Sequence, residues 1–271
     1  MNNFLQRTLS GFFFVAIVVG SILISPYIFA LVFVVITACT VYEFHKLTNV
    51  QSQIEVDQIL AATGSVILFL ASFFYASGLL QYFIYFVYAL YVMMVLVLEL
   101  YRKKKNSLHN WAYFLLGQVY TALPFSLLNY ILYIDKTFNP WLLIAMFATI
   151  WLYDTGAYLV GMAIGKHKMF ERISPKKTWE GFAGGTLVAL LVGYVCSIFI
   201  TDISLVSWLF FAVIVVVFGT FGDLIESLMK RTIHVKDSGK VIPGHGGLLD
   251  RFDSMLMVAP AIFIYLSLLF R

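Results

Sequence analysis

The stretch ILAATGSVILFLASFFYASGLLQYFIYFVYALYVMMVLVLEL, residues 59–100, decides the fold class. It contains two apolar runs, 59–76 and 79–98, separated by a Ser-Gly break. Each run is close to the roughly 20 residues that a helix needs to cross the hydrocarbon core of a bilayer. Neither run shows the period-two alternation that is typical of a barrel strand. The stretch therefore predicts two consecutive membrane-spanning helices.

The rest of the chain has the same character. Its composition is 61% hydrophobic and 12% charged, whereas soluble domains carry about 25% charged residues. We therefore predict an all-α, polytopic integral membrane protein with about nine transmembrane helices, and we exclude a water-soluble fold. The predicted spans are Leu9–Ser25, Pro26–Tyr42, Ile59–Ala76, Leu79–Leu98, Trp111–Ile134, Pro140–Ile164, Gly181–Ile200, Leu205–Met229 and Phe252–Phe270.

The basic residues predict the orientation in the membrane. With nine spans and a cytoplasmic N-terminus, 16 of the 18 Lys and Arg residues fall on the cytoplasmic side. Only Lys136 and Arg271 fall on the other side. Short cytoplasmic loops retain such an excess of basic residues. We expect a multi-pass protein of the cell (plasma) membrane, with its N-terminus and its longest polar loops in the cytoplasm.

No segment is long enough and polar enough to form a separate soluble domain. The longest polar interruptions, 167–180 and 230–251, are about 14 and 22 residues. We therefore expect one integrated membrane domain, in which residues 1–150 form N-terminal transmembrane helices and residues 151–271 form a catalytic region with cytosolic loops. Any chemistry must be built from spans and short loops.

Acidic residues inside apolar spans are the first functional signal. Asp154, Asp223 and Glu226 lie within predicted spans, where a charge at the bilayer centre costs about 2.5–3.5 kcal/mol. An alternative for the last two is that they face water near a span end. On a helix, Asp223, Ser227 and Lys230 would share one polar stripe, and Glu226 and Lys230 could pair at i, i+4.

The loop that follows combines cations, glycines and carboxylates. Carboxylate oxygens hold Mg²⁺, cations neutralise phosphates, and glycines let backbone N–H groups approach an anion. This combination indicates phosphoryl or nucleotidyl transfer. Its residues are Arg231, Lys236, Lys240, His245, Gly246, Gly247, Asp250, Arg251 and Asp253.

A second polar patch, SPKKTWEG at residues 174–181, lies just before a predicted helix, whose N-terminus favours anions. Taken alone it is typical of a helix cap and a membrane anchor. Because it shares the cytoplasmic face with the glycine-containing loop, it is also interpreted as half of a nucleotide site. The residues concerned are Ser174, Lys176, Lys177, Thr178 and Glu180.

Two pairs of glycines spaced four apart, Gly161 with Gly165 and Gly181 with Gly185, need a separate interpretation. The first pair precedes a lysine, but it lacks the spacing, the following Ser or Thr and the preceding strand of a P-loop. Small residues at this spacing instead favour close packing of membrane helices.

Residues 227–253, SLMKRTIHVKDSGKVIPGHGGLLDRFD, fit the pattern S-x-x-K-R, four residues, K-D, then H-G-G-x-x-D-R-x-D. With this signature the chain resembles the phosphatidate cytidylyltransferase (CDP-diglyceride synthetase) family. The runs 174–181 and 154–158 are similar to that family as well, so the resemblance covers the chain from about Trp151 to its end.

The resemblance implies that CTP and phosphatidic acid react to give CDP-diacylglycerol and pyrophosphate, a step of phospholipid biosynthesis. It implies Mg²⁺ as the cofactor, with a second metal ion, divalent or K⁺, beside it. The implied partners are membrane lipids and a second copy in a homodimer, with no nucleic acid. Because the second pKa of a phosphate monoester is near 6, the attacking phosphatidate oxygen is already ionised and needs no general base.

The resemblance also implies residue roles. Asp223 and Asp250 become the leading metal ligands, with Glu226, Ser227 and Asp253 as nearby candidates. The cations Lys230, Arg231, Lys236, Lys240 and Arg251, with Lys176 and Lys177, become candidates for binding phosphates. His245 is either an acid or phosphate donor, or a structural hydrogen-bonding group.

Two other functions remain open from the sequence. A CTP-dependent polyprenol or phytol kinase would also need CTP, a metal and a membrane site, but it would release CDP. A secondary transporter would also place carboxylates in spans, but it would not need a loop dense in Lys, Gly and Asp. Product analysis separates the first from the proposed reaction, and a requirement for CTP separates the second.

Overall fold

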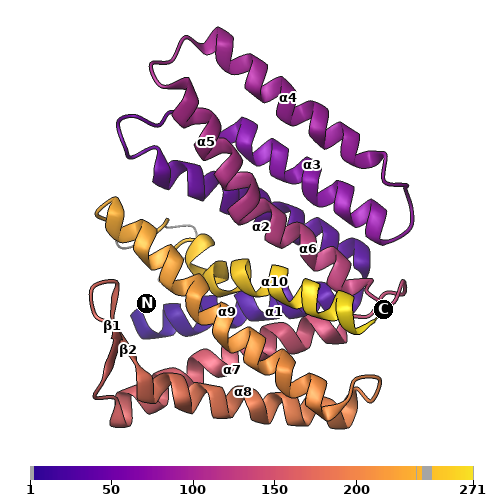
Figure 1. Cartoon of the computed structure of the whole chain (residues 1–271), viewed down its shortest axis with the longest axis vertical. Helices are drawn as coiled ribbons and strands as arrows, with labels where there is room; N and C mark the ends of the chain where they lie inside the picture. The colour runs from indigo at the N-terminus through magenta and orange to yellow at the C-terminus, as the bar shows by residue number, and fades with distance from the viewer. Residues whose placement is uncertain (1–2, 236, 240–245, 271) are drawn as a thin grey trace. The chain divides into compact units, whose positions relative to one another are not determined.

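We describe the protein from a computed structural model that describes residues 3–235, 237–239 and 246–270. The chain divides into two compact units (Figure 1). Unit 1 comprises Met1–Asn139 and Ile233–Phe252, and unit 2 comprises Pro140–Thr232 and Asp253–Arg271. The predicted division near residue 150, within one integrated membrane domain, stays a prediction.

The prediction of a helical membrane protein is confirmed. Within the described residues, eight helical segments are long and apolar enough to cross a membrane. A shorter apolar helix, Thr8–Ile24, corresponds to the predicted first span. The protein is therefore a multi-pass membrane protein. The eight segments are Pro26–Thr48, Gln58–Ala76, Ile84–Arg102, Ser107–Leu132, Trp141–Ile164, Trp179–Phe199, Leu205–Thr232 and Leu249–Leu269.

Unit 1 is a helical layer built around aromatic side chains. Its helices are α1 (Asn3–Ile24), α2 (Pro26–Thr48), α3 (Gln58–Ala76), α4 (Ile84–Arg102), α5 (Ser107–Gly117), the π-helical turn η1 (Gln118–Ala122), α6 (Leu123–Leu132) and the first turn of α10 (Leu249–Leu269). In its core, the rings of Phe33 and Phe125 pack edge-on against Phe252, with centroids 6.4 and 5.1 Å away. Such geometry stabilises aromatic pairs. The first turn of α10 is thereby packed against α2 and α6.

A polar network lies where α4 ends in unit 1. The buried carboxylate of Glu99 accepts hydrogen bonds from Arg102 Nη1 and Asn110 Nδ2, both at 2.6 Å. Beside it, Lys104 Nζ pairs with the exposed Glu55 at 2.5 Å. This hydrogen bond and the lysine charge hold the pKa of Glu55 below its usual value. The basic run after α4 is thus tied to the loop before α3.

Unit 2 contains α7 (Trp141–Ile164), the strands β1 and β2, α8 (Trp179–Phe199), α9 (Leu205–Thr232) and the remainder of α10. Helices α7 and α8 lie side by side (Figure 1). A Cβ at Gly181 would lie 2.7 Å from the carbonyl oxygen of Ala157, and one at Gly185 would lie 2.8 Å from the ring of Tyr153. The interpretation as close-packing residues is therefore confirmed for Gly181 and Gly185.

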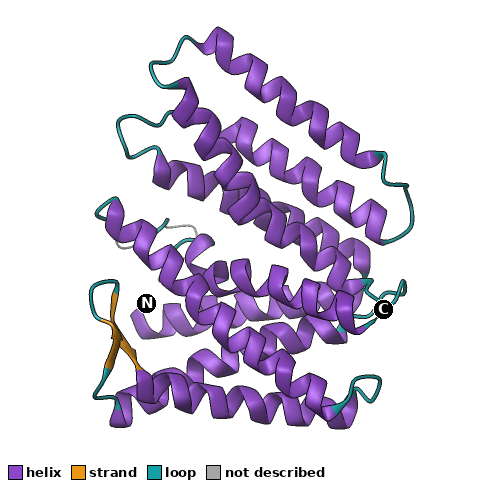
Figure 2. Cartoon of the chain, viewed as in Figure 1, coloured by secondary structure: helices purple, strands orange, loops and turns teal. Residues whose placement is uncertain are grey.

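The structure adds a hairpin that the sequence did not predict. Strands β1 (Lys168–Phe170) and β2 (Ser174–Thr178) pair antiparallel, with Lys168 opposite Thr178 and Phe170 opposite Ser174 (Figure 2). The hairpin is short and polar, so it leaves the all-helical character of the membrane part unchanged. It matters because β2 carries lysines of the predicted site.

Candidate functional site

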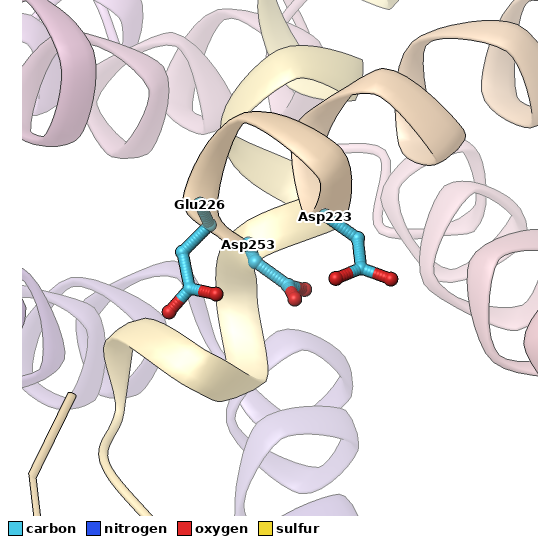
Figure 3. Close-up of side chains that lie close together, drawn as sticks. All are labelled: Asp223, Glu226 and Asp253. Carbon is cyan, nitrogen blue, oxygen red and sulfur yellow. The ribbon is translucent and has the colours of Figure 1, made fainter. Parts of the chain in front are cut away.

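Three carboxylates gather in unit 2. Asp223 and Glu226 project from α9, and Asp253 projects from α10 (Figure 3). One oxygen of each lies within 4.8 Å of one oxygen of each of the others. Glu226 is fully buried, whereas the other two are partly exposed. We call these three residues the acidic cluster.

A glycine on α9 brings the cluster together. The Cα of Gly222 faces α10, and a Cβ there would lie 2.6 Å from the carbonyl oxygen of Asp253 and 3.0 Å from the Cα of Ser254. No side chain fits at that distance, so only glycine permits this approach of the two helices. Asp223, the next residue, is thereby carried to the side of Asp253.

Two lysines bring positive charge to the cluster. Lys177 Nζ, from β2, lies 2.7 Å from Asp223 Oδ2 and 3.4 Å from the carbonyl oxygen of Thr220. Lys230 pairs with Glu226 one turn along α9, as its i, i+4 spacing predicted. Ser227 Oγ donates a 3.2 Å hydrogen bond to Asp223 Oδ1. The polar stripe expected on α9 is confirmed by this bond and the Glu226–Lys230 pair.

A fourth carboxylate faces the same region. Asp154, on α7, interacts electrostatically with Lys177 and Asp223 and with Asp253. Its neighbour Tyr153 forms a 2.6 Å hydroxyl hydrogen bond with Thr220 of α9, which ties α7 to the helix that carries two cluster residues. The sequence indicates Asp154 as a carboxylate inside a span, but the predicted site residues do not include it.

The acidic cluster has the chemistry of a metal site. Carboxylate and hydroxyl oxygens are hard ligands, and Mg²⁺ is typically held by one or two carboxylates together with substrate phosphates. Three carboxylates from two helices, with a serine hydroxyl on one of them, could hold such an ion. The partly exposed Asp223 and Asp253 leave room for further ligands on the open side.

Asp250, the other predicted metal ligand, lies in unit 1 and has different neighbours. Its carboxylate accepts hydrogen bonds from the backbone N–H groups of Ser238, at 3.0 Å, and Gly247, at 2.9 Å. The preceding Gly246 has a φ of 84°, in the left-handed region that favours glycine. Asp250 thus joins Ser238 and Gly247, which lie on either side of the undescribed residues 240–245. Its predicted role as a metal ligand stays a prediction.

Sequence reasoning missed Glu43 of α2, a carboxylate that is only 3% exposed. Its Oε2 accepts a 3.0 Å hydrogen bond from the backbone N–H of Leu249, at the start of α10. The signal was the same one that singled out Asp154, a carboxylate in an apolar helix. It was overlooked because the predicted span ended at Tyr42, whereas α2 continues to Thr48.

Hairpin residues of the predicted nucleotide site have structural contacts as well. Thr178 caps α8, its side chain accepting a hydrogen bond from the N–H of Gly181 at 3.2 Å. Glu180 accepts hydrogen bonds from the backbone N–H groups of Lys166 and His167 and from the ring Nδ1 of His167, the last at 2.6 Å. These bonds close the base of the hairpin, as the helix-cap alternative expects.

The remaining predicted residues divide into exposed ones and ones beyond the described part of the chain. Lys176 of β2 is exposed and Ser174 is half-buried. Arg231 is exposed at the end of α9, with its Nε 3.5 Å from the carbonyl oxygen of Ile173, and Arg251 is exposed on the first turn of α10. Lys236, Lys240 and His245 lie outside the described residues.

Comparison with known proteins identifies the family. A sequence profile described as the Cytidylyltransferase family matches residues 5–269. The chain belongs to this family. The matched range includes all three residues of the acidic cluster and the glycine-containing loop, so the site described above is part of what the family model covers.

Relatives named phosphatidate cytidylyltransferase are similar to this chain over shorter stretches, as three examples show. That of Staphylococcus saprophyticus is 42% identical over 60% of this chain and 62% of its own length. That of Staphylococcus haemolyticus is 50% identical over 44% of this chain and 46% of its own length. The Staphylococcus aureus protein is 35% identical over 80% of this chain and 82% of its own length.

Proposed function

We propose that this protein is a phosphatidate cytidylyltransferase, which converts CTP and phosphatidic acid into CDP-diacylglycerol and pyrophosphate. The observation that carries the proposal is the acidic cluster with Lys177 and Lys230 beside it, in a chain that belongs to the cytidylyltransferase family. The name carried by its relatives supports the same reaction.

In this reaction a phosphatidate oxygen forms a bond to the α-phosphorus of CTP, and the bond from that phosphorus to the β-phosphate oxygen breaks. Pyrophosphate leaves with the electron pair. The attacking phosphate is ionised near neutral pH, so the residues of the site need not remove a proton. Their task is to bring two anions together and to stabilise the charge of the departing group.

The two lysines beside the acidic cluster supply the positive charge. Lys177 is held by Asp223 at 2.7 Å and is a quarter exposed, so its ammonium group can reach a phosphate without leaving the site. Lys230 is held by the buried Glu226, which fixes its position at the end of α9. Fixed cations of this kind need no reorganisation during the reaction.

We propose Mg²⁺ as the ion held by Asp223 and Asp253, with Glu226 and Ser227 as further candidates and with place for a second ion, divalent or K⁺. Asp250 of unit 1 stays a separate candidate ligand. When bound, Mg²⁺ supplies positive charge against the triphosphate and the departing pyrophosphate. The donor set supports this assignment, because all the candidate atoms are hard oxygens. Phosphate groups of the substrate would complete the coordination.

The test is to incubate purified protein in lipid nanodiscs with CTP, phosphatidic acid and Mg²⁺ and to identify both products. We expect lipid-linked CMP and one equivalent of pyrophosphate. Diacylglycerol and polyprenols, which lack the attacking phosphate, should not react. Release of CDP with a newly phosphorylated lipid alcohol would instead assign the protein to the lipid kinases.

We propose that the site faces the cytoplasm, because the partition of basic residues favours this orientation. In a variant lacking Cys39 and Cys196, a cysteine replacing the exposed Thr137 or Asp202 should react with an impermeant thiol reagent outside intact cells. A cysteine replacing the exposed Asp237 should react only after lysis. Ser238 is a poor probe because it is buried. External labelling at Asp237 would contradict the proposed orientation.

We further propose, from the resemblance to the family, that the protein forms a homodimer in the membrane and has no nucleic-acid partner. The mass of the protein in nanodiscs, measured by light scattering with the lipid contribution subtracted, tests the first point. A single copy of the 30.7 kDa chain would contradict it.

A further inference from the structure

Glu43 of α2 is a carboxylate in a position that is hard to explain by packing alone. It is 3% exposed, within a helix whose neighbouring residues Phe44 and Val41 are fully buried. Burying a carboxylate is unfavourable unless hydrogen bonds compensate for the lost water. The contacts of Glu43 therefore show what the side chain is for.

Those contacts are with the beginning of α10. The N–H of Leu249 donates to Glu43 Oε2 at 3.0 Å, and the backbone of Leu248 interacts favourably with the charge of this carboxylate. The first helical bonds of α10 run from the N–H groups of Arg251 and Phe252 to the carbonyl oxygen of Leu248. The N–H group held by Glu43 is thus one that the helix itself leaves without a partner.

Two glycines that flank the undescribed residues 240–245 lie close to the same carboxylate. A Cβ at Gly239 would lie 2.5 Å from Glu43 Oε1. A Cβ at Gly247 would meet the Ser238 hydroxyl first and would lie 2.6 Å from Glu43 Oε2. Neither position has the positive φ that would itself require glycine. Gly239 is therefore required by the nearness of Glu43, and Gly247 by the nearness of Ser238 and Glu43 together.

Asp250 completes the arrangement from the other side of the loop. It accepts hydrogen bonds from the backbone N–H groups of Ser238, which precedes Gly239, and of Gly247 itself. One carboxylate, that of Glu43, binds the helix N-terminus, and the other, that of Asp250, binds the loop. If Glu43 were removed, the start of α10 would lose the acceptor that sets its place against α2.

We propose that Glu43 is a positioning residue of the reaction: as a cap supplied by another helix, it fixes the first turn of α10 and thereby the Asp250 carboxylate and the loop that Asp250 holds. A negative charge at a helix N-terminus also interacts favourably with the helix dipole. The inference rests on the proposed function only in that Asp250 is taken to serve the cytidylyl transfer.

The experiment compares Glu43→Ala and Glu43→Gln with Glu99→Gln. Glu99 is the matched control, because it is also a buried carboxylate of unit 1, 4% exposed, but its partners are Arg102 and Asn110. Hydrogen–deuterium exchange of the segment 246–252 is measured in nanodiscs, without substrates. We expect at least tenfold faster exchange in Glu43→Ala, an intermediate change in Glu43→Gln, whose amide oxygen still accepts, and no change in Glu99→Gln.

Steady-state kinetics provide the second measurement. Misplacing a catalytic group by about 1 Å can cost on the order of 10²-fold in rate. Glu43→Ala should therefore lower kcat for CDP-diacylglycerol formation by about that factor, while KM for CTP changes less than about threefold. Glu99→Gln should retain kcat in the molecules that remain folded.

A double-variant cycle tests the contact itself. Gly239→Ala should slow the reaction in the native background, because its Cβ meets Glu43 Oε1. In the Glu43→Ala background the same change should have little further effect, since the obstructing oxygen is gone. Additive effects would show that the loop does not rest on Glu43.

The outcomes separate the inference from the proposed function. Unchanged exchange at 246–252 in Glu43→Ala overturns the inference, whatever the enzyme makes. If exchange is accelerated in Glu43→Ala but the native protein never forms CDP-diacylglycerol, the capping role of Glu43 stands and the proposed function is overturned. Accelerated exchange with unchanged kcat would also overturn the inference, because a cap without effect on turnover positions nothing in the reaction.

Discussion

The carboxylates of unit 2 and those of unit 1 have contrasting partners. In the acidic cluster, Asp223 and Glu226 face lysine side chains and one another. In unit 1, Glu43 and Asp250 accept hydrogen bonds from backbone N–H groups. A lysine ammonium group that is paired with a carboxylate keeps further N–H donors for a phosphate, whereas a backbone N–H group cannot leave its carboxylate without deforming the chain. The comparison suggests that the first set carries out chemistry and the second set holds the chain in place.

The largest effect should come from breaking the buried pair of the acidic cluster. Lys230→Gln leaves the fully buried Glu226 without its cation, and breaking a buried pair from one side costs about 3–5 kcal/mol. Thermal unfolding in detergent should show the loss. The double variant Lys230→Met with Glu226→Leu should recover most of the stability but not the activity. A single variant as stable as the native protein would contradict the role of Lys230 as a held cation.

The next effect concerns the open side of the cluster. Asp223→Asn and Asp253→Asn keep the side-chain volume and remove the charge, so each should lower the rate of CDP-diacylglycerol formation by about 10²–10³-fold. Each should also raise the Mg²⁺ concentration that gives half-maximal rate. Both are read from one Mg²⁺ titration of purified, folded variants. Near-native turnover in either variant removes that residue from the metal site.

Asp250→Asn sharpens the comparison, because this residue is both a predicted metal ligand and a loop anchor. We expect a fall of about 10²-fold, at the lower end of the range for a lost electrostatic stabiliser, together with a raised Mg²⁺ requirement. The asparagine amide keeps one oxygen for the N–H of Gly247. A lower rate with an unchanged Mg²⁺ requirement would place Asp250 wholly among the anchoring carboxylates.

The smallest effect should come from an exposed ion pair. Lys104→Ala removes the partner of Glu55. The pKa of Glu55 lies below its usual value in the native protein and should return towards that value in the variant. Because a depressed pKa stabilises the folded state above the unfolded-state pKa and loses this effect as pH falls, the variant should be slightly less stable at neutral pH and match the native protein in acid. Unfolding curves at both pH values provide the measurement, and a change in turnover greater than twofold would be unexpected.

The sequence predicted most of the membrane helices because a bilayer imposes its thickness on every span. It predicted the Glu226–Lys230 pair because three- and four-residue spacings place side chains on one helix face. It did not predict the hairpin, since strands of three and five residues are too short to show an alternating apolar pattern. The contact of Lys177 with Asp223 was not predicted either, because it depends on where β2 lies relative to α9. The cap by Glu43 joins residues 206 positions apart, a pairing that no local pattern contains.

The length of α9 has a consequence for the depth at which the reaction takes place. At 28 residues the helix is about 42 Å long, while the hydrocarbon core is about 30 Å thick. Its apolar part, residues 205–222, fills most of that thickness, so Asp223 to Thr232, about 14 Å of helix, extend into the layer of lipid head groups. For the proposed reaction, this depth would let the site meet the phosphate of a lipid at the level where that phosphate already lies, while a water-soluble nucleotide reaches the site from the aqueous side.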